Sequence, residues 1–237
     1  MKLRFVGIIS GILIMIFGTA GVLFKTRYKD FNKEEAPLDK MIVGIMYDSM
    51  IDQQISIIEK GDAGRGLPSI MDSEMILAVE CTEHSLFRYR CMTQRVRVLK
   101  VFQGDELSPY DEIDVAKSNS GVYCFDKESE DFLIGHYGAN MGFASVMTPG
   151  KKYLVFLNSN VDNVRGEQIW LLHDNLLPTR FCYDEIANDP VVPISKDYHG
   201  AFYEDMKGNE FFLESDNSVQ KIAELKARLL QKFPLSQ

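Results

Sequence analysis

Four cysteines offer the most direct chemistry in this sequence, because a thiol can form a disulfide, bind a metal or act as a nucleophile. No two of them have the Cys-x-x-Cys spacing of a redox site or zinc ribbon; they are Cys81, Cys91, Cys124 and Cys182. Cys81 and Cys91 are equally distant from Leu86, so a hairpin centred there would bring them together across two strands. Cys124 and Cys182 are then the second pair by elimination. We therefore predict structural disulfides, with four buried free thiols as the next alternative and a catalytic thiol as the third.

The four histidines form no metal-binding motif. Neither His-x-x-x-His nor His-Glu-x-x-His spacing occurs among them; they are His84, His136, His173 and His199. His84 and His173 both end predicted strands and could meet at one rim of a barrel. A metal or catalytic site would have to be assembled from separate loops. We predict no metal, no cofactor and no catalytic residue, and we expect that the protein is not an enzyme.

The segment 119–147 combines aromatic and apolar side chains with carboxylates. The first group is Tyr123, Phe125, Phe132, Leu133, Ile134 and Tyr137, and the second is Asp126, Glu128, Glu130 and Asp131. The segment joins the third and fourth predicted strands, where loops of small barrels often carry recognition. Aromatic anchors with an acidic rim suit a basic peptide or protein partner. The alternative to this candidate partner-binding loop is a covering loop held in place by Cys124.

Two other patterns are weaker. Asn158, Asn160, Asp162 and Glu167 alternate like calcium ligands, but glycine is missing from the sixth loop position and Ile169 occupies the twelfth. A hairpin loop is expected there instead. The glycines of residues 61–68 are not followed by Gly-Lys-Ser/Thr, and the chain has no Gly-x-Ser-x-Gly elbow. Neither a phosphate-binding loop nor an α/β-hydrolase is therefore predicted.

Composition narrows the classes of function. The chain has 237 residues, of which 46% are hydrophobic and 25% are charged, so it can bury a core. Its 26 Lys and Arg stand against 34 Asp and Glu, which gives a net charge of −8. The chain lacks the surplus of cations with which nucleic-acid-binding proteins replace phosphate counterions. We predict no nucleic-acid partner.

An apolar run occupies residues 5–24, where every residue is apolar or small. A helix that rises about 1.5 Å per residue needs about 20 such residues to cross the hydrocarbon layer. The run continues beyond the small residues 18–20, which favours an uncleaved signal anchor over a cleaved signal peptide. Basic residues flank both ends of the run, namely Lys2, Arg4, Lys25, Arg27 and Lys29. Because large acidic domains with even cysteine counts are usually exported, we predict a cytoplasmic N-terminus and an extracytoplasmic C-terminal domain in the cell membrane.

The elements that would position these residues follow from the hydrophobic period. Residues 1–27 are assigned to the transmembrane anchor, 28–37 to a charged linker, and 38–60 to a helix that packs on the domain and ends before Gly61. Residues 61–237 are assigned to the domain itself. From residue 75 the period becomes that of strands, and the predicted strands are 75–81, 87–102, 111–117, 153–157 and 168–172.

Four details refine these elements. The apolar set changes parity near Thr93 and Gln94, which predicts a bulge typical of strands that wrap a small barrel. Residues 153–157 lack polar alternation, which predicts a central strand covered on both faces. Residues 201–215 look like a hairpin that turns at 207–209. A final helix begins near capping residues 216–218, and its apolar stripe should lie against the barrel; the stripe is Val219, Ile222, Leu225, Leu229 and Phe233.

Four strand and turn segments follow one another at a distinctive spacing: DSEMILAVEC, VRVLKVFQGDEL, DEIDV and PGKKYLVFL. Together they resemble the netrin-like family, which includes the tissue inhibitors of metalloproteinases, over about residues 75–170. The resemblance implies a five-stranded OB-type barrel, an exported location and a binding or inhibitory role. In those inhibitors a mature N-terminal cysteine meets the protease zinc. This chain has no such cysteine, so that mode of inhibition is not carried over.

The sequence as a whole predicts a mainly β fold with flanking helices: one N-terminal transmembrane helix, an OB-like five-stranded barrel, an added hairpin and a C-terminal helix. We predict a membrane-anchored, extracytoplasmic binding module whose partner is another protein or a peptide at the cell surface. One alternative is an exported hydrolase or metal-dependent enzyme, which clustering of His84, His173 and a carboxylate would favour. The other is a protease-inhibitor-like protein that acts through a barrel-rim loop.

Overall fold

The structure is a computed structural model of the chain. It describes residues 42–88, 91–117, 124–126, 131–133, 141–162, 168–173, 178–193 and 200–235. The chain divides into two units, Met1–Glu34 and Glu35–Gln237, and all described residues belong to the second unit.

The second unit is built mainly from strands. The strands are β1 (Ile42–Gly44), β2 (Met75–Cys81), β3 (Leu86–Arg88), β4 (Cys91–Gln103), β5 (Glu112–Lys117), β6 (Cys124–Asp126), β7 (Asp131–Leu133), β8 (Lys152–Asp162), β9 (Gln168–Leu172), β10 (Arg180–Cys182) and β11 (Gly200–Phe202). The helices are α2 (Asp48–Lys60), the short 3-10 helix η2 (Ile70–Asp72), α3 (Tyr203–Met206) and α4 (Asp216–Lys232).

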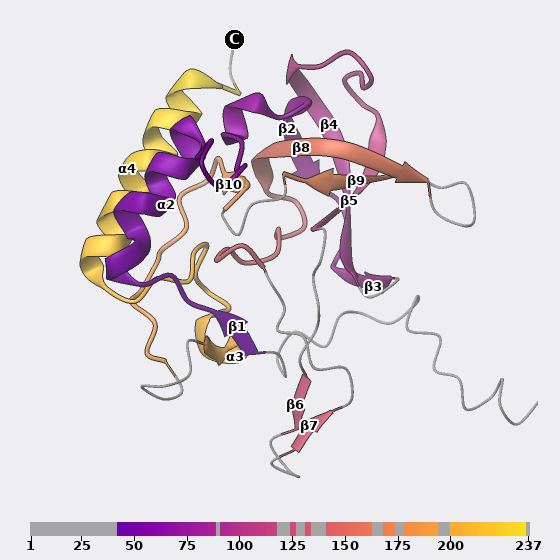
Figure 1. The fold of residues 1–237 in the computed structure, drawn as a ribbon. Helices are drawn as coiled ribbons and strands as arrows, with labels where there is room; N and C mark the ends of the chain where they lie inside the picture. Colours follow the sequence, from indigo (N-terminus) through magenta and orange to yellow (C-terminus); the bar gives the residue numbers. More distant parts are fainter. Residues whose placement is uncertain are drawn as a thin grey trace, which may run out of the picture. The chain divides into compact units, whose positions relative to one another are not determined.

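Five strands close into an OB-like barrel (Figure 1). Their order is β8-β2-β4-β5-β9, and β9 pairs back onto β8. The long strand β8 closes the circle because residues 152–157 pair with β2 and residues 157–162 pair with β9. The β5–β9 pair is parallel, whereas the other four pairs of the circle are antiparallel. Two short strands extend this sheet: β10 pairs with β8, and β3 pairs with β4.

The first half of strand β8 lacks the usual alternation of polar and apolar residues because both of its faces are covered. All of residues 153–157 are buried. Tyr153, Val155 and Leu157 belong to the cluster that fills the barrel, whereas Leu154 and Phe156 belong to a second cluster under the helices. Because successive side chains of a strand point to opposite faces, both faces are covered by apolar groups. The prediction of a central strand buried on both faces is confirmed.

Helices α2 and α4 lie side by side on the barrel (Figure 1). Ile51 and Ile58 of α2 and Ile222, Leu225 and Leu229 of α4 are buried in the second cluster. The predicted apolar stripe of the final helix therefore packs as expected. Its N-cap is one residue earlier than predicted: the Ser215 hydroxyl accepts from the Ser218 backbone N–H at 3.3 Å, and the Ser215 N–H donates to the Ser218 hydroxyl at 3.1 Å.

The predicted helix over 38–60 is wrong in its first part. Residues Ile42–Gly44 form β1, which pairs antiparallel with β11. The helix α2 begins at Asp48 and ends at Lys60, where Gly61 adopts a φ of 70° and donates its N–H to the Ile57 carbonyl. The predicted glycine cap is thus confirmed, because this left-handed conformation suits glycine. The strand was missed because its partner lies far along the chain.

The predicted fold needs correction in two further elements. No helix in the described part of the chain is long and apolar enough to cross a bilayer, and the predicted span, residues 5–24, lies outside that part. The predicted hairpin over 201–215 is wrong as well. Its first arm pairs with β1 and continues into α3, whereas Phe211 bridges to Ala144 and Leu213 bridges to Met46. The two arms therefore pair with segments distant in sequence rather than with each other.

The predicted long strand over 87–102 is divided into β3 and β4, which pair antiparallel with Arg88 opposite Cys91. Its bulge is also displaced. The β2–β4 register shifts between Ile76 and Leu77 and again between Ala78 and Val79, opposite the second half of β4 rather than near Thr93. The parity change has another cause, namely the division of the predicted strand: Phe87 lies in β3, whereas the buried Met92, Val96 and Val98 share one parity within β4.

Candidate functional site

The structure contradicts the predicted disulfides. Cys81 and Cys182 are free and buried, and each predicted bridge required one of them. The β3–β4 turn falls between Arg88 and Cys91 rather than at Leu86, so Cys81 faces Val96 across the β2–β4 pair. Five residues of strand separate Val96 from Cys91, a distance of about 16 Å along the strand, which a disulfide cannot span. The other two predicted positions, Cys91 and Cys124, begin β4 and β6.

The environment of the two buried thiols makes them poor nucleophiles. Burial raises the pKa of Cys81 to about 11, and burial also raises the pKa of Cys182. The Cys81 thiol donates to the Glu83 carbonyl at 3.3 Å. A thiol with a raised pKa stays protonated at neutral pH, and the thiolate is the reactive form. Both cysteines therefore behave as core residues.

The predicted meeting of His84 and His173 does not occur. His173 is buried. Its backbone N–H donates to the Phe156 carbonyl at 2.8 Å, and its ring Nδ1 shares a hydrogen bond of 2.9 Å with the Ser73 hydroxyl. Ser73 precedes β2, whereas the exposed His84 follows β2. The two histidines therefore lie toward opposite ends of β2, which spans about 23 Å for its seven residues. His136 and His199 lie outside the described residues.

The described residues contain no group of three or more side chains that could hold a metal ion. Asn160, which the calcium-like pattern included, donates instead from its amide to the Glu106 carboxylate at 3.1 Å. Asp162 ends β8, and Glu167 lies outside the described residues.

The candidate partner-binding loop contains a two-stranded ribbon. Strands β6 and β7 pair antiparallel with Phe125 opposite Phe132 and Cys124 opposite Leu133. Among the described strands these two pair only with each other, so the ribbon is separate from the barrel sheet. Tyr123, Ile134 and Tyr137 lie outside the described residues. The role of this loop in binding a partner stays a prediction.

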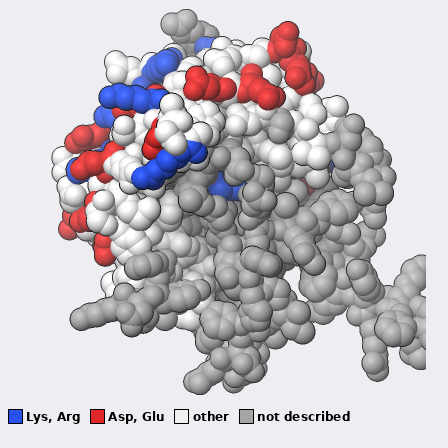
Figure 2. Space-filling view, viewed as in Figure 1, with Lys and Arg blue, Asp and Glu red and all other residues white. Residues whose placement is uncertain are grey.

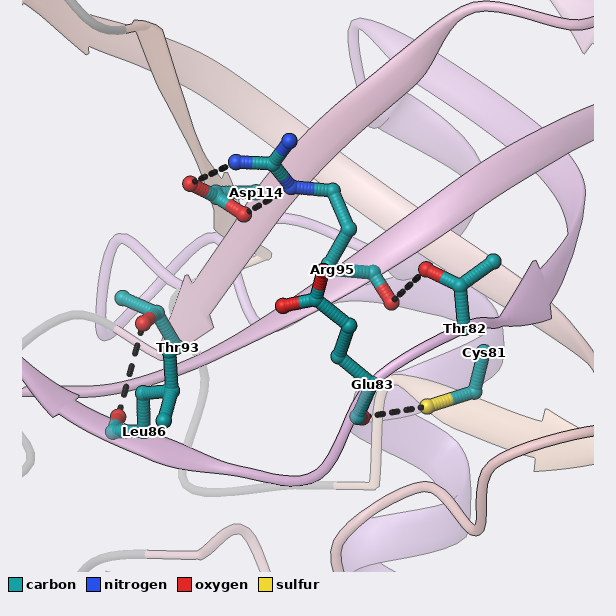
Figure 3. A network of polar contacts seen from close by, with 7 residues as sticks. All are labelled: Cys81, Thr82, Glu83, Leu86, Thr93, Arg95 and Asp114. Carbon is teal, nitrogen blue, oxygen red and sulfur yellow. Dashed lines mark hydrogen bonds and ion pairs between the residues drawn. The ribbon is translucent and has the colours of Figure 1, made fainter. Parts of the chain in front are cut away.

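The outer face of β4 and β5 carries a network of charged side chains (Figure 3). Arg95 holds Asp114 with two parallel hydrogen bonds, Nε to Oδ1 at 2.6 Å and Nη2 to Oδ2 at 2.9 Å. The hydrogen bonds that Arg95 donates to Asp114 raise the pKa of Arg95. The Thr82 hydroxyl donates to the Arg95 carbonyl at 3.2 Å and so ties the end of β2 to β4. Two-point geometry of this kind orients both side chains.

A second arginine on this face lies between two carboxylates. Glu80, Arg97 and Glu112 are directly opposite one another on β2, β4 and β5. The guanidinium of Arg97 is 3.9 Å from Glu80 and 3.1 Å from Glu112. Both arginines of the face are therefore engaged by carboxylates, and the face as a whole is acidic.

The turn between β4 and β5 extends this acidic face. It contains three exposed carboxylates, Asp105, Glu106 and Asp111, together with Tyr110. Tyr110 is 81% exposed and has a φ of 78°, a conformation uncommon outside glycine. Figure 2 shows red acidic side chains toward the top right of the view without blue ones among them, whereas on the left side, where α2 and α4 lie, red and blue side chains are mixed. We call the outer face of β4 and β5, the adjoining Glu80 and Glu83, and the β4–β5 turn the acidic face; Glu83 lies beside Arg95 in Figure 3.

A cavity of about 240 Å³ lies beside the barrel, next to β8 and β10 and not on the acidic face. We call it the lateral cavity. It lies between β8, β10, the segment 144–148 and the segment 207–210, and its polar lining includes Thr148, Lys151, Tyr153, Arg180, Lys207 and Glu210. It is somewhat smaller than the roughly 300–1,000 Å³ of drug-sized ligand sites.

The wall of the lateral cavity is held by side chains that contact the backbone. Arg180 donates to the carbonyls of Ser145 at 2.6 Å, Met141 at 3.0 Å and Ala144 at 2.5 Å. Gln94 forms two hydrogen bonds of 2.7 Å with the N–H and carbonyl of Met147, as a neighbouring strand would. These bonds hold the segment 141–148 against the barrel.

Neither Arg180 nor Glu210 belongs to a sequence motif, and neither was predicted as a site residue. Arg180 follows a stretch with weak hydrophobic period, and its acceptors lie 35 to 39 positions earlier in the chain. Glu210 accepts from the Cys182 backbone N–H at 2.6 Å, again from a distant segment. Spacing along the chain gives no signal for contacts of this kind, because only the tertiary fold brings the partners together.

Comparisons with known proteins do not assign the chain to a family. No protein-family model matches the chain. The curated proteins likewise include no match.

Proposed function

We propose that the OB-like barrel is a binding module whose acidic face takes a basic peptide segment or a basic protein surface. The observation that carries this proposal is the charge of the face. Its two arginines, Arg95 and Arg97, are both engaged by carboxylates. The exposed turn residues Asp105, Glu106 and Asp111 form no ion pair with any described residue.

The position of the face supports the proposal. The second and third strands of OB barrels commonly carry the ligand, and here these strands are β4 and β5. In OB proteins that bind nucleic acid, this surface supplies cations for phosphates. The acidic face offers the opposite charge, and the exposed Tyr110 adds an aromatic group of the type that anchors protein interfaces.

This proposed binding role does not depend on the family to which the chain belongs. The resemblance to netrin-like domains stays a prediction, because one barrel architecture serves proteins of many functions. The expected location outside the cytoplasm also stays a prediction. The alternative of an exported enzyme was to be favoured by a cluster of His84, His173 and a carboxylate. That cluster does not form, because His84 and His173 lie toward opposite ends of β2.

The test measures binding of two synthetic peptides to the full chain by fluorescence anisotropy. One peptide interleaves Lys and Arg with aromatic residues, and the other carries Glu and Asp at the same positions. We expect saturable binding of the basic peptide that weakens as salt is raised, since exposed charges are screened over about 10 Å at 0.1 M salt. Equal affinity for both peptides would contradict the proposal.

Matched charge reversals locate the site. Asp105 and Glu83 are exposed, and no described residue forms an ion pair with either side chain. The double reversal Asp105→Lys and Glu83→Lys should weaken binding about fivefold, which corresponds to about 1 kcal/mol. The control is the double reversal Glu224→Lys and Asp205→Lys, which changes the net charge equally at exposed positions of α4 and α3 and should leave the affinity unchanged. An equal loss in the control would show that net charge rather than the acidic face governs binding.

A further inference from the structure

The lateral cavity is positively charged although the chain carries a net charge of −8. Three cationic side chains line it: Lys151, Arg180 and Lys207. Among its described lining residues, Glu210 is the one carboxylate. The net charge of the chain does not predict a local excess of cations, so the fold must bring these three side chains together for a separate reason.

The charge of Glu210 is directed at a fourth cation. Its Oε2 accepts from Lys226 of α4 at 2.5 Å, and its Oε1 accepts from the Cys182 N–H at 2.6 Å. Both oxygens are therefore engaged by groups that tie α4 and β10 together. The positive charges of Lys151, Arg180 and Lys207 are left without an ion pair to any described residue.

Arg180 is the least exposed of these cations, with 6% of its surface accessible. Its Nε and Nη2 donate to three backbone carbonyls, whose dipoles offset its charge in part. Among the described residues none accepts a hydrogen bond from Nη1. Burial lowers the pKa of Arg180 to about 10, so the guanidinium is still cationic at neutral pH. The charge of Glu210 also raises the pKa of Arg180, but Glu210 forms no ion pair with it, because its oxygens are engaged by Lys226 and the Cys182 N–H. A buried cation without an ion-pair partner is costly, and a bound anion would offset that cost.

The remaining lining fits a small, partly apolar ligand. Ile186, Val146 and Ala144 contribute apolar surface, and the Thr148 side chain is next to the cations. The Tyr153 hydroxyl accepts from the Thr148 N–H at 2.8 Å, and burial keeps its pKa well above the ordinary value, so the phenol is protonated. The polar lining thus consists mainly of hydrogen-bond donors, which match the acceptor oxygens of an oxyanion.

We propose that the lateral cavity is a binding site for a small organic oxyanion, a carboxylate or phosphate group on a compact apolar body. Arg180 and the two lysines bind the oxygens, and Ile186 and Val146 contact the body. This site lies on β8 and β10 and is independent of the partner proposed for the acidic face. A small ligand here would also stabilise the fold, because it would link β8 and β10 to the segment 144–148.

The test uses the full chain and three probes: inorganic phosphate, benzoate and phenyl phosphate. Isothermal titration calorimetry measures each affinity, and thermal unfolding measures the accompanying stabilisation. We expect saturable binding at millimolar or lower concentration, with the organic anions binding more tightly than inorganic phosphate because they bury apolar surface. Tighter binding of benzoate would identify a carboxylate ligand, and tighter binding of phenyl phosphate a phosphate ligand. Absence of saturable binding for all three would overturn the proposal.

Neighbouring lysines provide a matched pair of variants. Lys151 lines the cavity, whereas the adjacent Lys152 is exposed and is not part of the lining. Lys151→Gln should weaken binding of the best probe about fivefold to tenfold, and Lys152→Gln should change it less than about twofold, because both remove one charge but only the first removes a donor from the cavity. Lys207→Gln should act like Lys151→Gln. Equal effects of Lys151→Gln and Lys152→Gln would overturn the assignment, since they would indicate adventitious binding to surface charge.

Discussion

Replacement of Arg180 tests whether one buried side chain holds the segment 141–148 on the barrel. The variant Arg180→Met keeps most of the side-chain volume but removes three hydrogen bonds to the carbonyls of Met141, Ala144 and Ser145. Removal of a buried charge can stabilise a protein when its partner is also removed. Here the carbonyls stay behind and lose their donor, so we expect destabilisation.

The magnitude follows from the number of bonds. A hydrogen bond from a charged donor contributes about 1.5 kcal/mol or more, and a buried carbonyl left without a donor adds a desolvation penalty. Allowing for the recovered cost of burying the guanidinium, we expect a loss of about 3–5 kcal/mol in the free energy of unfolding. This is a large part of the roughly 5–15 kcal/mol that stabilises a typical domain.

Urea unfolding of the full chain measures this loss, and Arg228→Met is the control. Arg228 on α4 pairs with Glu59 at 2.8 Å, but its side chain is 52% exposed, so its removal should cost about 0–1 kcal/mol. A second readout is hydrogen exchange, which should accelerate more at the Ser145 and Thr148 amides than at the α4 amides, because the segment 141–148 also opens locally. A loss for Arg180→Met no larger than that of the control would refute the reasoning.

Three further predictions concern other described residues. Asp114→Asn breaks the two-point contact with Arg95 at a nearly buried position and should cost about 1–3 kcal/mol in urea unfolding; a cost near zero would mean that the contact is solvated like an exposed pair. Cys81 and Cys182 should react with an alkylating mass tag without any reductant once the chain is unfolded, and should resist it in the folded chain at pH 8; a requirement for reductant would reinstate a disulfide. Burial raises the pKa of Glu210 above 4.5, so the folded chain binds more protons than the unfolded chain in the window above that value, and stability falls as the pH rises through it. Glu210→Gln should flatten that part of the stability curve against pH, and a steeper decline in the variant would contradict the assigned direction.

Elements with local patterns were predictable from the sequence. The strands predicted at 75–81 and 168–172 match β2 and β9 residue for residue. The stripe of the final helix correctly identified Ile222, Leu225 and Leu229 as its packed face. These signals are local because the alternation of a strand and the 3.6-residue period of a helix are set by neighbours a few positions away. The OB-like barrel was expected from the resemblance of its strand and turn segments to the netrin-like family.

Pairings between distant segments were not predictable in the same way. The disulfide prediction placed a hairpin turn at Leu86, but the turn falls three residues later, and that shift moves Cys81 opposite Val96. A strand pair has no preferred register without its turn and its buried face, so small errors in the turn displace every contact. The strand β1 was taken for helix because its partner, β11, lies near the other end of the chain.

By itself, then, the sequence indicated most strands of the barrel, the final helix and the apolar faces of these elements, and its net charge predicts no nucleic-acid partner. The tertiary structure alone decided where charge is concentrated. Arg180 and Glu210 have no motif and no periodic neighbours, and they become informative only when β10 and the segment 207–210 meet beside β8. The physical reason is that periodicity records the burial of single elements, whereas a binding cavity depends on contacts between elements that are far apart in the chain.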